Sequence, residues 1–398
     1  MFYEGNLVVW RTTMKYFDYA ATCPLDPEAA SAFVKASTEY YGNSQSLHDI
    51  GSRASTLLEG CREEIARLLG VKKEGVYFTS GGSEGNFLAI QSLLSQSSKK
   101  GKHIITNIAE HSSIHSSLKM LKDYEITELP LMENGMIDVQ QFQSAIRDDT
   151  VLACIQHVNS EIGTIQPLNE IGALCKENGI LLHSDCVQSF GKLDVKTITP
   201  FVDSLAISGH KIYGPKGIGA LYVSPSIPFD SYYPNTSHER GMRPGTVNIP
   251  AIVSMVTAAS KQVRNLPHNY EHMKSLREQF LSHLMDVRDE ISIHGNEVEQ
   301  LPSILGLRIK GLEGQWVMLE ANRKGYAIST GSACQVGLST PSKTMIAQGI
   351  DDKSAKEFIR ISFGVHTTEA DVKGLAQTII AIIQEAPQRD NQITIMVK

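Results

Sequence analysis

Short apolar runs alternate with helical patterns along the first half of the chain. Between residues 54 and 225, amphipathic stretches such as Ala54–Leu69 lie between runs that have strand character. Strands that alternate with helices predict a mostly parallel sheet covered by helices on both faces, and therefore an α/β fold. The runs predicted as strands are Gly75–Thr79, His103–Asn107, Val151–Val158, Ile180–Ser184, Ser204–Ser208 and Gly219–Val223.

The pattern changes beyond about residue 266 and predicts a smaller α+β domain. Its expected elements are helices at Tyr270–Arg288, Gly314–Lys324 and Thr368–Glu385, and strands at Ser303–Ile309 and Ile359–Phe363. The predicted organisation is an N-terminal extension at 1–13, a segment at 14–25 that packs with the smaller domain, a large domain at 26–265 and the small domain at 266–398.

The composition limits the class of protein. The chain has 398 residues, 41% of them apolar, and its 37 Lys and Arg against 43 Asp and Glu give a net charge of −6. At about 150 residues per domain, this length suggests two or three domains or one large α/β domain with an appendage. The apolar content excludes disorder as the main state. A mildly acidic chain has no general attraction to nucleic acid or to an anionic membrane.

Targeting and metal-binding signals are not found. No segment approaches the roughly 18 uninterrupted apolar residues of a membrane span, and residues 1–13 do not resemble a secretory signal. The cysteines form no C-x-x-C pair, so we predict no metal site. Scattered cysteines in a large non-secreted chain indicate a reduced, cytoplasmic protein. The six are Cys23, Cys61, Cys154, Cys175, Cys186 and Cys334.

Polar side chains follow five of the predicted strands. Because ligands of open α/β sheets bind beyond the carboxyl ends of the strands, we expect these side chains to form one site. They are Ser80–Glu84 with two glycines, then Glu110 and His111, then Asn159, then Asp185 and Gln188, and finally Ser208, His210 and Lys211.

Three of these features have both a chemical and a structural interpretation. Gly81-Gly82-Ser83 before a helix suits a phosphate, but a plain strand-to-helix turn has the same sequence. Asp185 ends a strand and suits a buried cation, or caps the next helix. Lys211 follows a buried strand, where desolvation would make its amine nucleophilic, or it forms a structural ion pair. A lysine, an upstream aspartate and a phosphate cradle are together what a pyridoxal phosphate site requires.

Several long motifs in order resemble one known family. The chain resembles the NifS/IscS-type cysteine desulfurases, within the class V aminotransferase group of fold-type I pyridoxal phosphate enzymes, from about Tyr16 to Glu385. The resemblance implies a large domain with a mostly parallel central sheet flanked by helices, and a smaller α+β domain with the catalytic cysteine loop. The motifs that carry it are Asp18–Thr22, Tyr41–Asn43, Ser46–His48, Phe78–Glu84, Glu110-His111, His157–Gly163, Ser208–Gly217, His238–Thr246, Gly331–Cys334 and Ile359–Ser362.

The resemblance implies a role for each matching residue in cofactor binding. Lys211 would hold the pyridoxal 5′-phosphate aldehyde as an imine, Asp185 would bond the pyridine nitrogen, and Gln188 would bond the ring hydroxyl. His111 would stack on the ring and move protons. The phosphate would be held by Gly82, Ser83, Ser208 and His210, with Thr246 contributed by the other subunit of a homodimer.

The resemblance also implies the substrate and the reaction. Asn159 and Arg360 would bind the carboxylate of L-cysteine, and Arg suits this because its planar fork is bidentate. Cys334 would accept sulfur as a persulfide and pass it to an acceptor protein for iron–sulfur cluster assembly or for another thio-cofactor or tRNA pathway. L-Alanine would be the second product, and neither nucleic acid nor membrane would be a direct partner.

Cys334 also stands out from the other cysteines by its surroundings. It lies in a small, polar stretch without helical or strand periodicity, whereas inert cysteines lie in apolar runs. Cys61, Cys154 and Cys175 lie in helical or apolar patterns and are interpreted as structural, and Cys23 and Cys186 as packing residues. The other interpretation of Cys334 is a surface loop cysteine without function.

Two kinds of alternative remain open from the sequence. A selenocysteine lyase, a kynureninase-like hydrolase or a class V aminotransferase would share Lys211 and Asp185 without needing Cys334. A non-catalytic sulfur-transfer assembly partner would keep the fold, although it would have no use for the set of Asp185, His210, Lys211 and Arg360.

Overall fold

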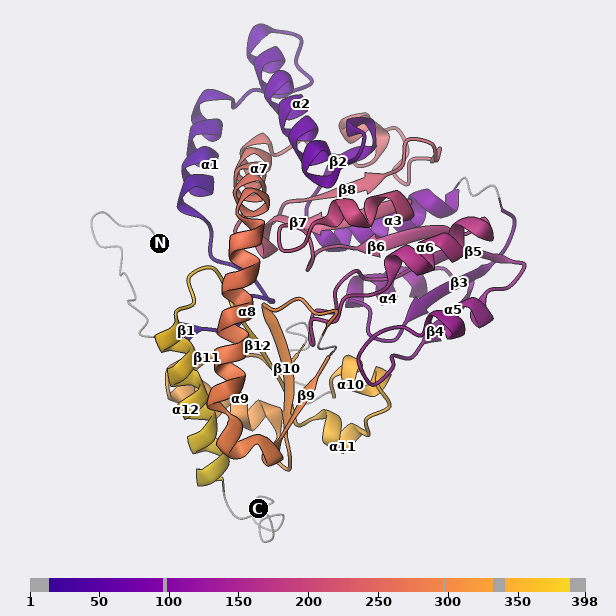
Figure 1. Cartoon of the computed structure of the whole chain (residues 1–398). Helices are drawn as coiled ribbons and strands as arrows, with labels where there is room; N and C mark the ends of the chain where they lie inside the picture. The colour runs from indigo at the N-terminus through magenta and orange to yellow at the C-terminus, as the bar shows by residue number, and fades with distance from the viewer. Residues whose placement is uncertain (1–13, 96–98, 296–297, 332–340, 387–398) are drawn as a thin grey trace, which may run out of the picture.

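A seven-stranded sheet is the centre of the larger part of the molecule (Figure 1). The computed structural model describes residues 14–95, 99–295, 298–331 and 341–386. The strand order is β2-β8-β7-β6-β5-β3-β4, and only β8 runs against its neighbours β2 and β7. The strands are β2 (Val76–Thr79), β3 (His103–Asn107), β4 (Glu125–Leu129), β5 (Thr150–Cys154), β6 (Leu181–Asp185), β7 (Ser204–Ser208) and β8 (Gly219–Val223).

Helices cover both faces of this sheet, as the alternating pattern predicts. Phe78 and Ala153 face a core formed with helices α2, α5, α6 and α7. Tyr77 and Cys154, one residue away along the same strands, face the core formed with α3 and α4. Successive side chains of a strand point to opposite faces, so each strand contributes to both cores. The helices are α2 (Asp49–Leu69), α3 (Gly82–Ser95), α4 (Ser112–Lys119), α5 (Val139–Ala145), α6 (Leu168–Glu177) and α7 (Ile249–Arg264).

The predicted strands agree with the observed ones to within a few residues. The α/β fold with a mostly parallel sheet is confirmed. The sequence did not indicate β4, which is an edge strand in which only Leu129 is buried and Glu125 and Glu128 are exposed. β5 ends at Cys154, so the strand predicted to reach Val158 is shorter than expected, although Ile155 and His157 still donate to carbonyls of β6.

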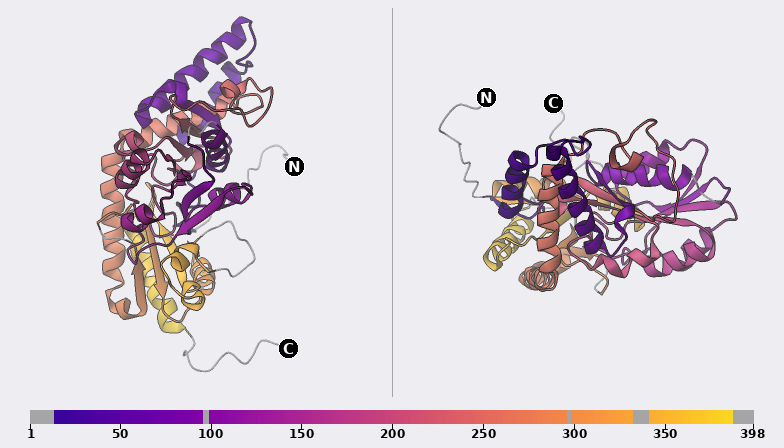
Figure 2. Two further views of the ribbon diagram at one scale, coloured as in Figure 1. Left: turned by 90° about the vertical axis from the view of Figure 1, so that its right-hand side faces the viewer. Right: turned by 90° about the horizontal axis from the view of Figure 1, so that it is seen from above.

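A second, antiparallel sheet of three strands lies beside the first (Figure 2). Its order is β12-β10-β9, and it packs with α8, α9 and α12 around a separate apolar core. A final pair of short parallel strands joins β1 to β11. The elements are β1 (Lys15–Tyr16), α8 (Leu266–His283), β9 (Ile291–His294), β10 (Ile304–Ile309), α9 (Gly314–Arg323), β11 (Tyr326–Ala327), β12 (Phe358–Ser362) and α12 (Glu369–Glu385).

The N-terminal segment joins the second sheet before the chain enters the first. Phe17 is fully buried in the core of the second sheet, and its carbonyl accepts a hydrogen bond from the N–H of Ser362 at 2.8 Å. The chain then passes Ala20 and Ala21 into α1 (Pro27–Glu39), which packs on α7. The domain boundaries drawn from the sequence stay a prediction. Within the described ranges, no helix has the length and apolarity that crossing a bilayer needs.

Candidate active site

A cavity of about 280 Å³ opens beyond the carboxyl ends of the central strands. Its walls come from the turns after β2, β3, β5, β6 and β7, from the N-terminal segment and from β12 of the second sheet. Eight residues predicted from the sequence line it together, namely Gly82, Ser83, His111, Asp185, Gln188, Ser208, His210 and Lys211, and Arg360 completes the wall. The parallel strands thus bring residues far apart in the chain to one edge.

Lys211 directs its amine into the cavity from the short 3-10 turn that follows β7. The Nζ donates to the carbonyls of Ala20 at 2.6 Å and Ala21 at 2.8 Å. Burial, and then the positive charge of Arg360, lower the pKa of Lys211 to about 8. No carboxylate of the described residues forms an ion pair with this amine, so the structural ion pair considered for Lys211 is not found there. A nucleophilic amine is therefore accessible near neutral pH.

Asp185 is held at the end of β6 by hydrogen bonds to both carboxylate oxygens. Its Oδ1 accepts from the N–H of Val187 at 2.9 Å, and its Oδ2 accepts from the Nδ2 of Asn86 at 2.7 Å. Asn86 is itself oriented by His183, whose Nε2 lies 3.0 Å from the Asn86 Oδ1. Burial lowers the pKa of His183 to about 4, so its ring is neutral at pH 7 and donates one proton. Sequence reasoning missed Asn86, although a polar residue on the apolar face of α3 was a usable signal.

The turn after β2 approaches the turn after β6 closely enough to require a glycine. A Cβ atom on Gly82 would lie 2.5 Å from the Cγ2 of Val187. Gly82 is also the first residue of α3, so the positive end of that helix faces the cavity beside Ser208. His210 completes this corner, where its Nδ1 lies 3.1 Å from the hydroxyl of Thr22. Burial and the nearby Lys211 lower the pKa of His210 to about 4.

His111 lies at the mouth of the cavity and caps α4. Its Nδ1 accepts a hydrogen bond from the N–H of Ser113 at 3.2 Å, which leaves Nε2 to carry the ring proton when the ring is neutral. Desolvation of the ring lowers the pKa of His111, and the Asp185 carboxylate opposes this change. The imidazole is therefore a neutral ring with one free nitrogen.

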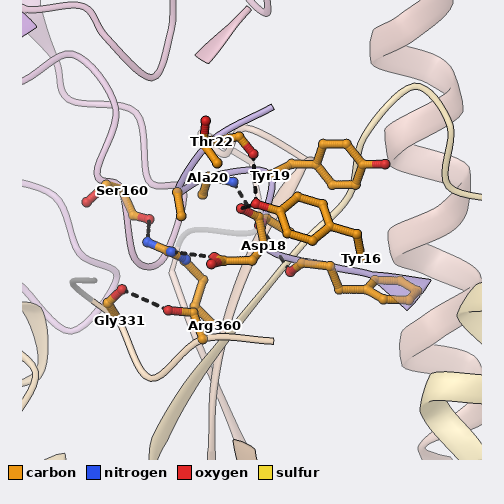
Figure 3. Close-up of polar contacts among 12 residues, drawn as sticks. Tyr16, Asp18, Tyr19, Ala20, Thr22, Ser160, Gly331 and Arg360 are labelled. Carbon is orange, nitrogen blue, oxygen red and sulfur yellow. Dashed lines mark hydrogen bonds and ion pairs between the residues drawn. The ribbon is translucent and has the colours of Figure 1, made fainter. Parts of the chain in front are cut away.

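Arg360 reaches the cavity from β12 and is fixed by two partners (Figure 3). Its Nη2 forms an ion pair with the Oδ1 of Asp18 at 2.7 Å, and its Nη1 donates to the carbonyl of Ser160 at 3.0 Å. The arginine side chain is 3% exposed, so its charge is desolvated on all sides but the cavity. Asp18 belongs to a motif recognised in the sequence, but its contact with Arg360 was not foreseen.

Two of the predicted residues that the structure describes, Asn159 and Thr246, do not line this cavity. Asn159 is fully buried, where its Oδ1 accepts from the N–H groups of Glu161 and Ile162 and its Nδ2 donates to Thr344. Thr246 is exposed and is not among the residues that line the cavity. Cys334 lies outside the described residues. The roles of all three stay predictions.

Comparison with known proteins places the chain in a family. A model described as aminotransferase class-V matches residues 15–375. The chain is 43% identical over 376 residues to a protein named putative cysteine desulfurase NifS from Bacillus subtilis (strain 168), with 94% of this chain and 95% of that one covered. It is 37% identical over 375 residues to the cysteine desulfurase IscS of Rickettsia bellii (strain OSU 85-389), with 93% and 91% covered.

A solved structure described as a NifS-like protein has the same architecture. It superposes with a TM-score of 0.86 at 29% identity, and 93% of this chain and 99% of that chain are covered. The chain therefore belongs to the class V aminotransferase family. Within that family its relatives are cysteine desulfurases of the NifS/IscS kind, which confirms the resemblance drawn from the motifs.

Proposed function

We propose that this protein is a cysteine desulfurase that uses pyridoxal 5′-phosphate and converts L-cysteine to L-alanine. The observation that carries the proposal is the Lys211 amine. Its pKa is lowered to about 8, and it lies in one cavity with Asp185, Gln188, His111 and Arg360. Sulfur would leave as a persulfide on Cys334 and pass to an acceptor protein.

The residues of the cavity fit this cofactor chemically. Asp185 is a carboxylate with both oxygens hydrogen bonded, which suits a protonated ring nitrogen. The corner formed by Gly82, Ser83, Ser208 and His210 supplies a helix N-terminus and hydroxyl groups, which suit a phosphate. His111 supplies a neutral ring for stacking. The cavity of about 280 Å³ leaves room for the cofactor between Asp185 and this phosphate corner.

When bound, pyridoxal phosphate supplies an electron sink for the charge that develops when a proton leaves the substrate Cα. Lys211 would take up that proton at Nζ, since a pKa of about 8 lets its amine act as a base near neutral pH. The carbonyls of Ala20 and Ala21 would hold the released amine in the cavity, because both already accept from Nζ. The neutral His111 ring would relay a proton at the cavity mouth.

Arg360 would bind the substrate carboxylate. The ion pair with Asp18 and the bond to Ser160 hold its guanidinium at the cavity wall, so little side-chain entropy is lost when substrate binds. Asn159 would assist indirectly, because its Oδ1 accepts from the N–H groups of Glu161 and Ile162 and so holds the turn that carries Ser160. The thiolate of Cys334 would attack the substrate sulfur, forming an S–S bond as the C–S bond breaks. The electron pair of that bond would remain on carbon, which takes up a proton and becomes the alanine methyl group.

The proposal includes a homodimer and a cytoplasmic setting. Thr246 is exposed on the segment that follows β8, where a second copy of the chain would take it into its own site. All five described cysteines are free thiols, which suits a reducing compartment. Sulfur acceptors in iron–sulfur cluster assembly, in other thio-cofactor synthesis or in tRNA thiolation fit this chemistry equally.

Anaerobic incubation with L-cysteine tests the proposal, with alanine and peptide masses measured together. Alanine with a one-sulfur mass gain on the Cys334 peptide is the expected result, and the Cys334→Ser protein should keep the cofactor and lose the gain. If alanine forms but the sulfur is found on another peptide, Cys334 is not the nucleophile. A coloured protein that gives neither product would support a selenocysteine lyase or an aminotransferase, and a colourless, inactive protein would support a non-catalytic assembly partner.

A further inference from the structure

A second lysine lies directly behind the cavity. Lys192 belongs to the tight turn that follows β6, and its Nζ donates to the Oε1 of Gln188 at 3.1 Å. It lines a separate small cavity of about 40 Å³ with Cys23 and Tyr213. Among the described residues it has no carboxylate within ion-pair distance, which is unusual for a largely buried ammonium group. A buried ammonium group without a counter-charge makes the free energy of folding less favourable, so the presence of Lys192 at this position calls for a functional explanation.

Two hydrogen bonds, one from Lys192 and one to the carbonyl of Ala20, decide which way the Gln188 amide points. An ammonium group only donates, so the atom that faces it must be the amide oxygen. The Nε2 is then directed the other way, where one of its protons goes to the carbonyl of Ala20 at 2.9 Å. Gln188 also lines the active-site cavity, so its second proton is available to an acceptor there. Lys192 thus makes Gln188 a donor toward the cavity.

The same turn carries a positive charge close to Lys211. The backbone of the turn packs on the residue after Lys211, because a Cβ atom on Gly191 would lie 3.0 Å from the Cγ2 of Ile212. Gln188, which Lys192 bonds, and Lys211 itself both donate to the carbonyl of Ala20, and the Sγ of Cys23 lies 3.4 Å from the carbonyl of Lys211. The charge of Lys192 is one of the causes that lower the pKa of Lys211.

We propose that Lys192 is a positioning residue that fixes the Gln188 amide as a donor toward the cavity and keeps a positive charge behind the Lys211 amine. The inference rests on the proposed function, because its consequence is read in the protein with cofactor bound. A hydrogen bond donated to the ring hydroxyl oxygen of the cofactor stabilises that oxygen without its proton. This bond and a positive charge nearby both disfavour a proton on the Lys211 nitrogen. Lys192 would therefore keep that nitrogen unprotonated at neutral pH, so that it can take up the proton of the incoming substrate ammonium group.

The other charged groups around the two lysines are accounted for in this expectation. Arg360 from β12 lowers the pKa of both amines, and Asp18 from the N-terminal segment raises that of Lys211. His111 and His210 have lowered pKa values and are neutral above pH 7. Removing Lys192 therefore removes a positive charge that no described neighbour replaces.

The test is a spectrophotometric pH titration of the purified holoenzyme, which reports the pKa of the Lys211 nitrogen. In Lys192→Met this pKa should rise by about one pH unit, as the loss of one nearby charge requires. Lys192→Arg should restore it to near the wild-type value, since the adjacent small cavity leaves space for a guanidinium group. Lys176→Met, which removes an exposed lysine on α6, is the matched control and should leave it unchanged.

Three results would overturn the inference. The first is an unchanged pKa in Lys192→Met, and the second is a rise in Lys192→Arg as large as in Lys192→Met. If Lys192→Met is insoluble, Lys192→Gln carries the same expected rise, and an unchanged pKa there would contradict the proposal in the same way. The third is a wild-type protein without a chromophore linked to Lys211, which would overturn the proposed function too. The first two results leave alanine formation by the wild type intact. Failure of the inference about Lys192 is therefore distinguishable from failure of the proposed function.

Discussion

The guanidinium of Arg360 and the carboxylate of Asp18 form an ion pair at 2.7 Å between residues separated by most of the chain. Asp18 belongs to the N-terminal segment and Arg360 to β12, and a backbone bridge from Asp18 to Ser362 places the two side by side. The cation that faces the cavity is thus held by residues of the second sheet and its N-terminal neighbour. Among the described residues, the larger part of the molecule contributes the carbonyl of Ser160, from the segment that follows β5.

This arrangement predicts the result of replacing Arg360 with lysine. A lysine retains the charge but cannot bond Asp18, Ser160 and a substrate carboxylate with a planar fork. We expect KM for L-cysteine to rise about tenfold, the equivalent of one lost charge-assisted hydrogen bond. Steady-state kinetics of alanine formation measures it. Arg308→Lys, at a partly buried ion pair with Glu357 in the second sheet, should leave KM near the wild-type value.

A second prediction concerns the buried pair of Arg62 and Glu239, which links α2 to the segment that follows β8. Arg62 donates to both oxygens of Glu239, at 2.8 and 3.1 Å, and the N–H of Phe78 in β2 also donates to this carboxylate. The two side chains are 2% and 1% exposed. Glu239→Gln would leave the buried guanidinium with only the partly exposed Glu59 as its counter-charge, and should lower the free energy of unfolding by about 3 kcal/mol.

Urea denaturation of the Glu239→Gln protein measures this loss. Arg67→Ala is the control, because Arg67 pairs with Glu64 at the surface and is 63% exposed. An exposed pair of this kind contributes about 1 kcal/mol or less. Equal losses in the two variants would contradict a special role for the buried pair.

The lowered pKa of Lys211 predicts a pH dependence of cofactor uptake by the apoprotein. Only the neutral amine reacts with an aldehyde, so the uptake rate should rise with pH and level off above about 8 rather than near 10.5. Because the folded-state pKa lies below the unfolded value, the unfolded chain binds more protons between these two pH values. The contribution of Lys211 to stability therefore rises with pH across that window.

Stopped-flow absorbance with added pyridoxal phosphate follows the uptake. The Lys211→Ala protein should show no covalent phase at any pH. A rate that continues to rise up to pH 10 would show that the amine is not desolvated in solution.

The buried histidines predict sensitivity to acid. His183 is fully buried with a pKa lowered to about 4, so the unfolded chain takes up a proton at higher pH than the folded protein does. Its contribution is present above the unfolded pKa of 6.5 and is lost as pH falls toward 4, by about 3 kcal/mol in all. His183→Gln retains an amide for Asn86 and should flatten the fall in unfolding free energy over this range.

Chemical denaturation at a series of pH values measures that slope. His268→Gln, at an exposed position on α8, is the matched control and should leave the slope as in the wild type. An identical slope in His183→Gln and the wild type would place the acid sensitivity elsewhere.

The sequence predicted the buried strands of the central sheet better than its exposed edge strand β4. Buried strands such as β7 consist of continuous apolar runs and were found with their observed bounds, whereas β4 has charged, exposed residues and no such run. The two-residue strands β1 and β11 are too short for any periodicity. Their pairing depends on contacts across the chain, which a local pattern does not contain.

The same distinction applies to the cavity. Side chains that follow a strand, such as Asp185 and Lys211, are predictable because parallel strands end at one edge. The carbonyls of Ala20 and Ala21 were not, because backbone acceptors have no sequence signature. Cys23, interpreted as a packing residue, is buried and also touches the Lys211 carbonyl.

The position of β8 has a consequence for synthesis on the ribosome. β2 is joined to the sheet only by β8, where Val76 pairs with Tyr222. A nascent chain that ends before Val223 lacks this pairing, and one that ends before Arg360 lacks the cation of the cavity wall. The Arg360 part of the wall thus forms only after β12 has been made, so chains that end before it should bind the proposed substrate, L-cysteine, weakly.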